Sequence, residues 1–204
     1  MTSDNAQQIE DWNGPLGHRW VEFQDEFDRF TQPFSEAALK AAAARPGEHV
    51  IDVGCGCGGS TLALARQVGP GGTVSGIDVS RPMLDQAKRP AAAANLTNGS
   101  FSETDVSNGR LPMDQDLLFS RFGVMFFAAP VPAFAHLRRS LKDRSLKNGG
   151  RLAFVCWRAP RDNPWAMLPL VAAREALGVT PPKSDPLAPG PFAFADETRV
   201  RAIL

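Results

Sequence analysis

Two aspartates and a run of glycines have the types and spacing needed to bind a nucleotide cofactor. Asp52 stands near the end of an apolar segment, 49–53, and a glycine-dense turn follows at 54–59; Asp78 ends the next apolar segment. Glycine lets a backbone bend sharply and contact a ligand, because any Cβ would block the approach. A carboxylate at the tip of the next strand can accept hydrogen bonds from ribose hydroxyls. The pattern indicates a domain that binds an adenosine-containing cofactor.

The glycine spacing alone does not identify that cofactor. Gly54, Gly56 and Gly59 match the G-x-G-x-x-G pattern of dinucleotide-binding domains. Asp52, however, lies two residues before the first of them, where its charge would repel a pyrophosphate and attract a ligand with an amino group. The chain also contains no tyrosine, so it lacks a Tyr–Lys pair for hydride transfer. An NAD(P)-dependent oxidoreductase stays an alternative that only the glycine spacing supports.

Four segments, in this order and spacing, resemble the class I S-adenosylmethionine-dependent methyltransferases. They are 51–58, 76–80, 116–124 and 146–154, and in the last Asn148 replaces the proline usual in that family. The resemblance implies a Rossmann-like α/β fold, S-adenosylmethionine as cofactor with S-adenosylhomocysteine as product, and methyl transfer to a small-molecule acceptor. The overall likeness is to the ubiquinone and menaquinone C-methyltransferases, and it does not name a substrate.

The resemblance implies a role for individual residues. Asp52 would hold the methionine end of the cofactor, directly or through water, and Asp78 would bind both ribose hydroxyls. Val79 and Met83 would sandwich the adenine, and Asp105 would accept a hydrogen bond from its exocyclic amine. The other residues expected at the cofactor are Gly54, Gly56, Gly58, Val106 and Ser120.

No catalytic residue follows from the sequence. A sulfonium methyl group is already activated, so proximity, alignment and a water-poor pocket can carry an in-line displacement. No general base stands out, and His18 in the N-terminal region is better explained as a structural residue. Ser120, Arg121 and Phe122 would floor the active site, where Arg121 either anchors a substrate carboxylate or pairs with a neighbouring carboxylate.

The composition excludes several other functions. With 22 basic and 22 acidic residues the formal net charge is zero, which gives no reason to expect a nucleic-acid partner. No apolar segment approaches the roughly 20 residues of a membrane span, and the first residues are polar, so we expect a cytoplasmic protein. The cysteines, Cys55, Cys57 and Cys156, are odd in number and form no second pair, so we expect neither disulfides nor a metal site.

Alternating patterns predict the elements that position these residues. Strands are expected at 49–53, 73–77, 100–104, 116–121 and 151–157. Helices are expected at 61–68, 80–94, 131–147 and 165–177, with a further helical region, 19–44, that Pro33 breaks in two. Such alternation predicts a parallel sheet with helices on both faces and a ligand at the carboxyl ends of its strands.

Three regions are predicted along the chain: an N-terminal helical lid at 1–47, a Rossmann-like cofactor-binding core at 48–157, and a proline-rich substrate lid at 158–204 that ends in an incomplete helix capped by Asp196. Trp12 and Trp20 would either pack on the core or line the substrate. The final strands of the family fold are absent from the sequence, which we interpret as a truncation. An open edge on the fifth strand would then favour a homodimer, and a catalytically inactive binding or assembly module is the alternative to an enzyme.

Overall fold

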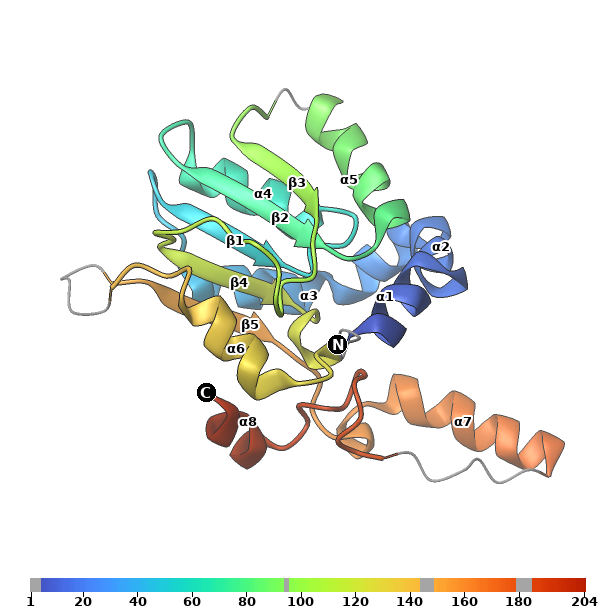
Figure 1. Cartoon of the computed structure of the whole chain (residues 1–204). Coiled ribbons are helices and arrows are strands. Elements are labelled where there is room, and N and C mark those ends of the chain that lie inside the picture. Colours follow the sequence, from blue (N-terminus) through green and yellow to red (C-terminus); the bar gives the residue numbers. More distant parts are fainter. Residues whose placement is uncertain (1–4, 94–95, 144–148, 179–184) are drawn as a thin grey trace.

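A parallel sheet of five strands forms the centre of the molecule (Figure 1). The structure is a computed structural model and describes residues 5–93, 96–143, 149–178 and 185–204. The strand order is β3-β2-β1-β4-β5. The strands are β1 (His49–Val53), β2 (Thr73–Asp78), β3 (Gly99–Glu103), β4 (Leu117–Arg121) and β5 (Arg151–Val155). The expected α/β class with a Rossmann-like parallel sheet is confirmed.

The described part of the chain contains eight α-helices. They are α1 (Ala6–Asn13), α2 (Pro15–Glu22), α3 (Gln24–Ala42), α4 (Gly59–Val68), α5 (Arg81–Ala93), α6 (Pro130–Arg138), α7 (Pro164–Leu177) and α8 (Glu197–Ile203). Two short 3-10 turns, η1 (Val124–Phe126) and η2 (Pro160–Asp162), complete the set.

The two faces of the sheet bury separate cores because successive strand residues point in opposite directions. On β1, Val50 packs in a cluster with residues of α3 and α4, whereas Ile51 packs on the opposite face with residues of α6. Both side chains are fully buried. The near-continuous apolar sequence of β1 is therefore explained by a central strand that is covered on both faces.

The topology places the switch point of the sheet at β1. From β1 the chain winds outward through α4, β2 and α5 to β3, and it then returns to pair β4 with the other side of β1. Ligands of open parallel sheets bind where neighbouring connections leave in opposite directions, at the carboxyl ends of the strands. The glycine turn after β1 and Asp78 at the end of β2 both lie there.

Some predicted boundaries were wrong. Pro33 lies inside the unbroken helix α3, and the chain instead turns at Phe23, between α2 and α3. The packing of α3 across β4 and β5 outweighs the hydrogen bond that a proline removes. The predicted helix 131–147 ends already at Arg138 in α6. Residues 144–147 of that prediction, residues 146–148 of the segment 146–154, and Ala94 of the predicted helix 80–94 lie outside the described residues.

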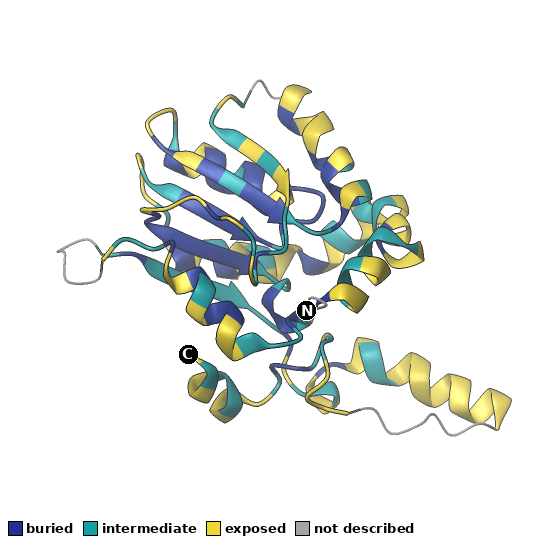
Figure 2. Cartoon of the chain, viewed as in Figure 1, coloured by how far each residue is buried: buried dark blue, intermediate teal, exposed yellow. Residues whose placement is uncertain are grey.

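The C-terminal region differs from the core in its exposure. The helix α7 extends away from the sheet and is exposed along most of its length (Figures 1 and 2). Its Leu168 and Leu177 side chains are among the most exposed large apolar groups of the chain. The expected capping of α8 is confirmed, since Asp196 Oδ1 accepts a hydrogen bond from the Thr198 amide at 2.8 Å. No helix within the described ranges has the length and apolar character that crossing a membrane requires.

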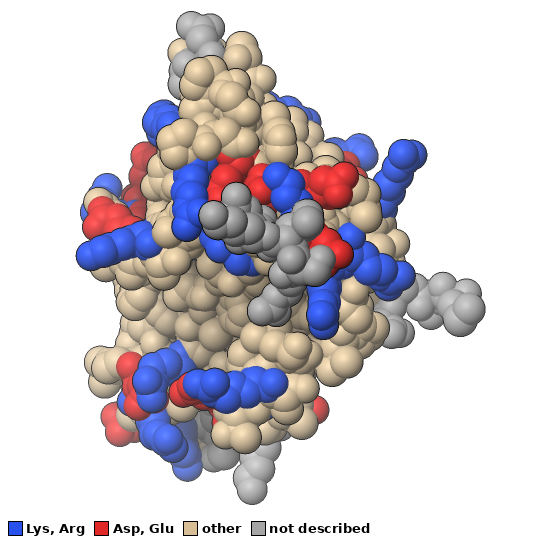
Figure 3. Space-filling model, turned by 90° about the vertical axis from the view of Figure 1, so that its left-hand side faces the viewer, with Lys and Arg blue, Asp and Glu red and all other residues tan. Residues whose placement is uncertain are grey.

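Charged side chains are mixed on the surface. On the face drawn in Figure 3, basic and acidic side chains lie side by side in an upper and a lower band, and uncharged surface lies between the two bands. This distribution agrees with the zero net charge of the chain, and the face drawn presents no continuous basic surface of the kind that binds a phosphate backbone.

Candidate functional site

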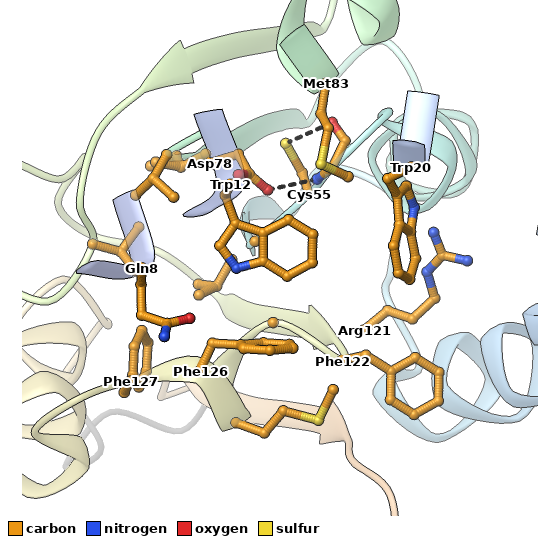
Figure 4. Close-up of a pocket in the computed structure, with 18 of the residues that line it drawn as sticks. Gln8, Trp12, Trp20, Cys55, Asp78, Met83, Arg121, Phe122, Phe126 and Phe127 are labelled. Atoms are coloured by element: carbon orange, nitrogen blue, oxygen red, sulfur yellow. Dashed lines mark hydrogen bonds between the residues drawn. The ribbon is translucent and has the colours of Figure 1, made fainter. Parts of the chain in front are cut away.

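A cavity of about 310 Å³ opens at the carboxyl ends of β1, β2 and β4 (Figure 4). Seven of the predicted cofactor residues line it: Gly54, Gly56, Asp78, Val79, Met83, Asp105 and Val106. The other three, Asp52, Gly58 and Ser120, lie behind this lining. The cavity thus brings together residues that are separated by more than 50 positions in the sequence.

The glycine turn presents bare backbone to the cavity. Gly54 and Gly56 have φ angles of +66° and +54°, a conformation that favours glycine. A Cβ on Gly54 would lie 2.9 Å from Gly123 Cα, and one on Gly56 would lie 2.8 Å from Met83 Cε. These two glycines therefore allow the turn to pass close to the chain after β4 and to Met83 in the cavity wall.

Asp78 lies beside the glycine turn and binds it. Its Oδ2 accepts a hydrogen bond from the Gly56 amide at 2.8 Å, and its Oδ1 accepts one from the Ser80 amide at 2.9 Å. Burial raises the pKa of Asp78, and the hydrogen bonds from Ser80 and Gly56 oppose that rise. Each carboxylate oxygen can accept more than one bond, so Asp78 can fix the glycine turn and still bind hydroxyl groups of a ligand.

Asp52 has a different environment from the one expected of a direct ligand. It is fully buried, and its Oδ2 accepts hydrogen bonds from Ser60 Oγ and Thr61 Oγ1, both at 2.7 Å, in the first turn of α4. Its Oδ1 is a buried side-chain oxygen with no hydrogen-bond partner among the described residues. Burial raises the pKa of Asp52, and the bonds from Thr61 and Ser60 oppose this. Asp52 thus lies outside the cavity lining, and its predicted hold on the methionine end of the cofactor, directly or through water, stays a prediction.

Gly58 and Ser120 support the site from behind. Gly58 has a φ of +83°, and a Cβ there would lie 2.8 Å from Ala87 Cβ and 2.9 Å from the Phe101 ring. Ser120 Oγ donates to the Val53 carbonyl at 2.8 Å and accepts a bond from the Gly123 amide at 3.3 Å. Gly58 thus serves close packing, and Ser120 fastens β4 to the end of β1.

The N-terminal helix contributes contacts that the sequence did not indicate. Asn5 Nδ2 donates to Asp105 Oδ1 at 3.0 Å, and its Oδ1 accepts from the Ala128 amide at 3.0 Å. Asn13 Nδ2 donates to the Val79 carbonyl at 2.8 Å. These bonds join residues that are 66 to 123 positions apart, so no local pattern could have predicted them. They hold α1 over the cavity beside Asp78 and Asp105.

A second part of the cavity is aromatic. Phe122 stacks on Trp157, with ring centroids 4.3 Å apart and an interplanar angle of 10°. Phe122 has a φ of +59°, which is uncommon for a bulky residue, and this conformation brings its ring to the cavity wall. Trp20 stacks on Phe27, and Trp12 meets Phe126 edge to face; Figure 4 shows the Trp12 and Phe126 rings in the cavity wall. Trp12 and Trp20 both lie in the cavity lining, and their contact with a substrate stays a prediction.

The charged groups of the cavity are few. Among the described lining residues they are Asp78, Asp105 and Arg121, and the lining includes no histidine or lysine. Burial raises the pKa of Cys55, the cysteine in the lining, well above its usual value, so its thiol stays protonated. In the part of the chain that the structure describes, no group of three or more His, Cys, Asp or Glu is arranged to hold a metal ion.

The fold and the cavity define a Rossmann-like domain with a nucleotide-cofactor site at the switch point of its sheet. Comparisons with known proteins narrow this class. Residues 50–144 match the model of a family described as "Methyltransferase domain". Together with the fold, this match identifies the region as a class I S-adenosylmethionine-dependent methyltransferase domain, which confirms the family resemblance. S-adenosylmethionine is the cofactor that this class of domain takes.

Individual relatives agree with this assignment. The chain is 31% identical over 127 residues to aklanonic acid methyltransferase of Streptomyces sp. strain C5, covering 62% of this chain and 56% of the relative. It is 36% identical over 121 residues to demethylmenaquinone methyltransferase of Symbiobacterium thermophilum, covering 57% and 45%. The chain thus spans about half the length of each relative. A solved S-adenosylmethionine-dependent methyltransferase of Aquifex aeolicus has the same fold, with a TM-score of 0.54, 22% identity, and coverage of 85% of this chain and 88% of that one.

Proposed function

We propose that this protein transfers a methyl group from S-adenosylmethionine to a small-molecule acceptor by in-line displacement. The observation that carries this proposal is the cavity, which joins a cofactor side of bare backbone and carboxylates to an aromatic side in one space. The family match supports methyl transfer. The names of the two relatives, which refer to aklanonic acid and demethylmenaquinone, support a small organic acceptor.

The residues of the cofactor side fit S-adenosylmethionine. Asp78 has lone pairs available for ribose hydroxyls, and Val79 and Met83 offer apolar surface for an adenine. Gly54 and Gly56 would let the methionine part contact the backbone, and Asp105 would accept a bond from the adenine amine. When bound, the cofactor supplies a methyl group that its sulfonium has already activated.

The remaining task of the protein is to orient the acceptor and exclude water. The aromatic rings of Trp20, Phe122, Trp157 and their neighbours can hold a planar apolar molecule and keep water from the reacting atoms. Because the described lining has no histidine or lysine, the acceptor would attack in a form that needs no proton removed by such a base. We infer that residues 1–47 act as a lid over the cofactor and that 158–204 cover the acceptor side.

Calorimetric titration with S-adenosylhomocysteine tests the cofactor site, with NADH as the control ligand. We expect the wild type to bind S-adenosylhomocysteine and not NADH. Asp78→Ala removes the acceptor of two ribose bonds, and hydrogen bonds to charged groups contribute about 1.5–3 kcal/mol each, so binding should weaken at least tenfold. The matched control is Glu103→Gln, at the tip of the neighbouring strand β3, which pairs with Arg81 outside the cavity. Equal affinities of wild type and Asp78→Ala would refute the role of Asp78.

Turnover is tested with radiolabelled methyl donor and a set of aromatic acceptors. Methylated product from the purified chain would establish an enzyme, whereas cofactor binding without any product would favour the inactive binding module. Tight binding of NADH would favour the oxidoreductase instead.

We also propose a cytoplasmic location and a homodimer through the edge of β5. In the described sheet, β5 pairs with β4 on one side only, and an unpaired strand edge is a template for a second chain. Sedimentation of the purified protein measures this directly, and a monomer at all concentrations would contradict the dimer.

A further inference from the structure

Arg121 brings a positive charge to the cavity. It ends β4, its side chain is 14% exposed, and it is the only lining residue in the described ranges with a cationic group. Its Nη1 donates to Thr31 Oγ1 at 2.9 Å and to Ser35 Oγ at 3.2 Å, and it lies 3.3 Å from Asp28 Oδ1. These contacts fix one end of the guanidinium against α3.

The other edge of the guanidinium has capacity left for a ligand. Nη2 donates only to the same Asp28 Oδ1, at a weak 3.4 Å, and Nε has no acceptor within the described part of the chain. A guanidinium has five N–H groups in one plane. The Nε–H and the outer Nη2–H point in parallel along one edge, and such an edge binds the two oxygens of a carboxylate together. Arg121 therefore keeps one complete two-donor edge.

Aromatic rings lie near the Arg121 guanidinium. Figure 4 shows the Arg121 guanidinium beside the Trp20 ring, with Phe122 next to it on the same side of the cavity. Trp20 is stacked on Phe27 with centroids 4.3 Å apart, and Phe122 is stacked on Trp157. A ligand whose acidic group reaches Arg121 would thus have its body among aromatic faces, which favour a planar ring.

We propose that the free edge of Arg121 is a carboxylate-binding site, and that its ligand is an acceptor in the form of a planar aromatic acid. This inference rests on the proposed methyltransferase function and adds the chemical class of the acceptor. The methionine end of the cofactor carries a carboxylate too, and it could compete for the same edge of Arg121. Arg121 is close enough to the glycine turn for this, because its partner Asp28 has Oδ1 3.9 Å from the position of a Cβ on Gly59, at the start of α4. The experiment therefore separates the two sources of the same group.

The test uses 2-naphthoate and its neutral isostere 2-naphthamide, each titrated calorimetrically into the full chain with saturating S-adenosylhomocysteine. We expect the wild type to bind the carboxylate at least tenfold more tightly than the amide. Arg121→Gln should remove this preference, a loss of about 1.4 kcal/mol or more for the carboxylate. It should leave the affinity for S-adenosylhomocysteine within about twofold, because the proposed ligand of Arg121 is the acceptor and not the cofactor.

Asp28→Asn is the matched control, because it removes the negatively charged partner of Arg121 and keeps the guanidinium. The preference for naphthoate should persist or increase in this variant, whereas a merely structural ion pair would make Asp28→Asn and Arg121→Gln behave alike. Equal binding of the two naphthalenes by a wild type that binds S-adenosylhomocysteine would overturn this inference alone. A tenfold loss of S-adenosylhomocysteine affinity in Arg121→Gln, with the naphthoate preference intact, would assign the edge to the cofactor and overturn the acceptor class. A wild type that does not bind S-adenosylhomocysteine would overturn the proposed function itself.

Discussion

Gly58 and Gly47 form a natural pair for measuring what close packing at the glycine turn contributes to stability. Their φ angles are +83° and +84°, so an alanine at either position incurs a similar backbone strain. A left-handed conformation costs an L-residue roughly 1–2 kcal/mol. Around Gly47 a Cβ would meet nothing within 4 Å, whereas at Gly58 it would lie 2.8 Å from Ala87 and 2.9 Å from two atoms of the Phe101 ring.

From these contacts we expect Gly47→Ala to lower the free energy of unfolding by about 1–2 kcal/mol. Overpacking of a filled site adds roughly 1–3 kcal/mol, so Gly58→Ala should lower it by about 2–5 kcal/mol. The assay is urea unfolding followed by circular dichroism, with the slopes compared to verify two-state behaviour. The difference between the two variants isolates the packing contribution.

A double mutant identifies the clashing group. Phe101→Leu removes the two ring atoms nearest Gly58, so Gly58→Ala should cost less in that background, by an amount on the order of 1 kcal/mol. If Gly58→Ala and Gly47→Ala destabilised the protein equally, the packing of Gly58 against β3 and α5 would be refuted, and Gly58 would be no more than a turn glycine.

Two further predictions concern titratable groups of the same region. Burial raises the pKa of Asp52, so the native state binds the carboxyl proton more tightly than the unfolded state does. The wild type should therefore lose stability relative to Asp52→Asn as pH rises through and above about 4. A constant difference in unfolding free energy between the two proteins from about pH 3 to about pH 7 would contradict this. Burial, with the charges of Asp28 and Asp78, raises the pKa of Cys57 to about 12. At about pH 8, iodoacetamide should therefore modify Cys57 roughly a thousandfold more slowly in the native protein than in the unfolded chain. Mass spectrometry of timed samples measures both rates, and similar rates would disprove the raised pKa of Cys57.

The sequence was sufficient for the elements whose local pattern and tertiary environment agree. The strand 49–53 was predicted with the bounds that β1 has, because an apolar run in a buried parallel strand has one interpretation. The strand β3, Gly99–Glu103, is weakly apolar because it lies at an edge of the sheet, and its predicted position was still within one residue. The turn at Pro33 was wrong because packing on β4 and β5 decides that region, and a local propensity does not contain this information.

The candidate site was predicted in part for the same reason. Gly54, Gly56 and Asp78 belong to contiguous motifs, and they line one cavity as expected. The burial of Asp52 behind the turn depends on hydroxyls of α4, so its environment required coordinates. The free edge of Arg121 depends likewise on which atoms α3 occupies, which left its two interpretations open in the sequence.

Residues 78–80, at the end of β2, contact both the cofactor side of the cavity and the N-terminal helix that carries Trp12. Asp78 faces the cofactor side, while Val79 and Ser80 fasten the N-terminal helix through the bonds of Asn13 Nδ2 to the Val79 carbonyl and of Ser80 Oγ to the Trp12 carbonyl. A ligand that orders this segment therefore also orders Trp12, which belongs to the aromatic wall. By thermodynamic reciprocity, we expect a ligand on the cofactor side and a ligand on the aromatic side to raise each other's affinity by the same factor.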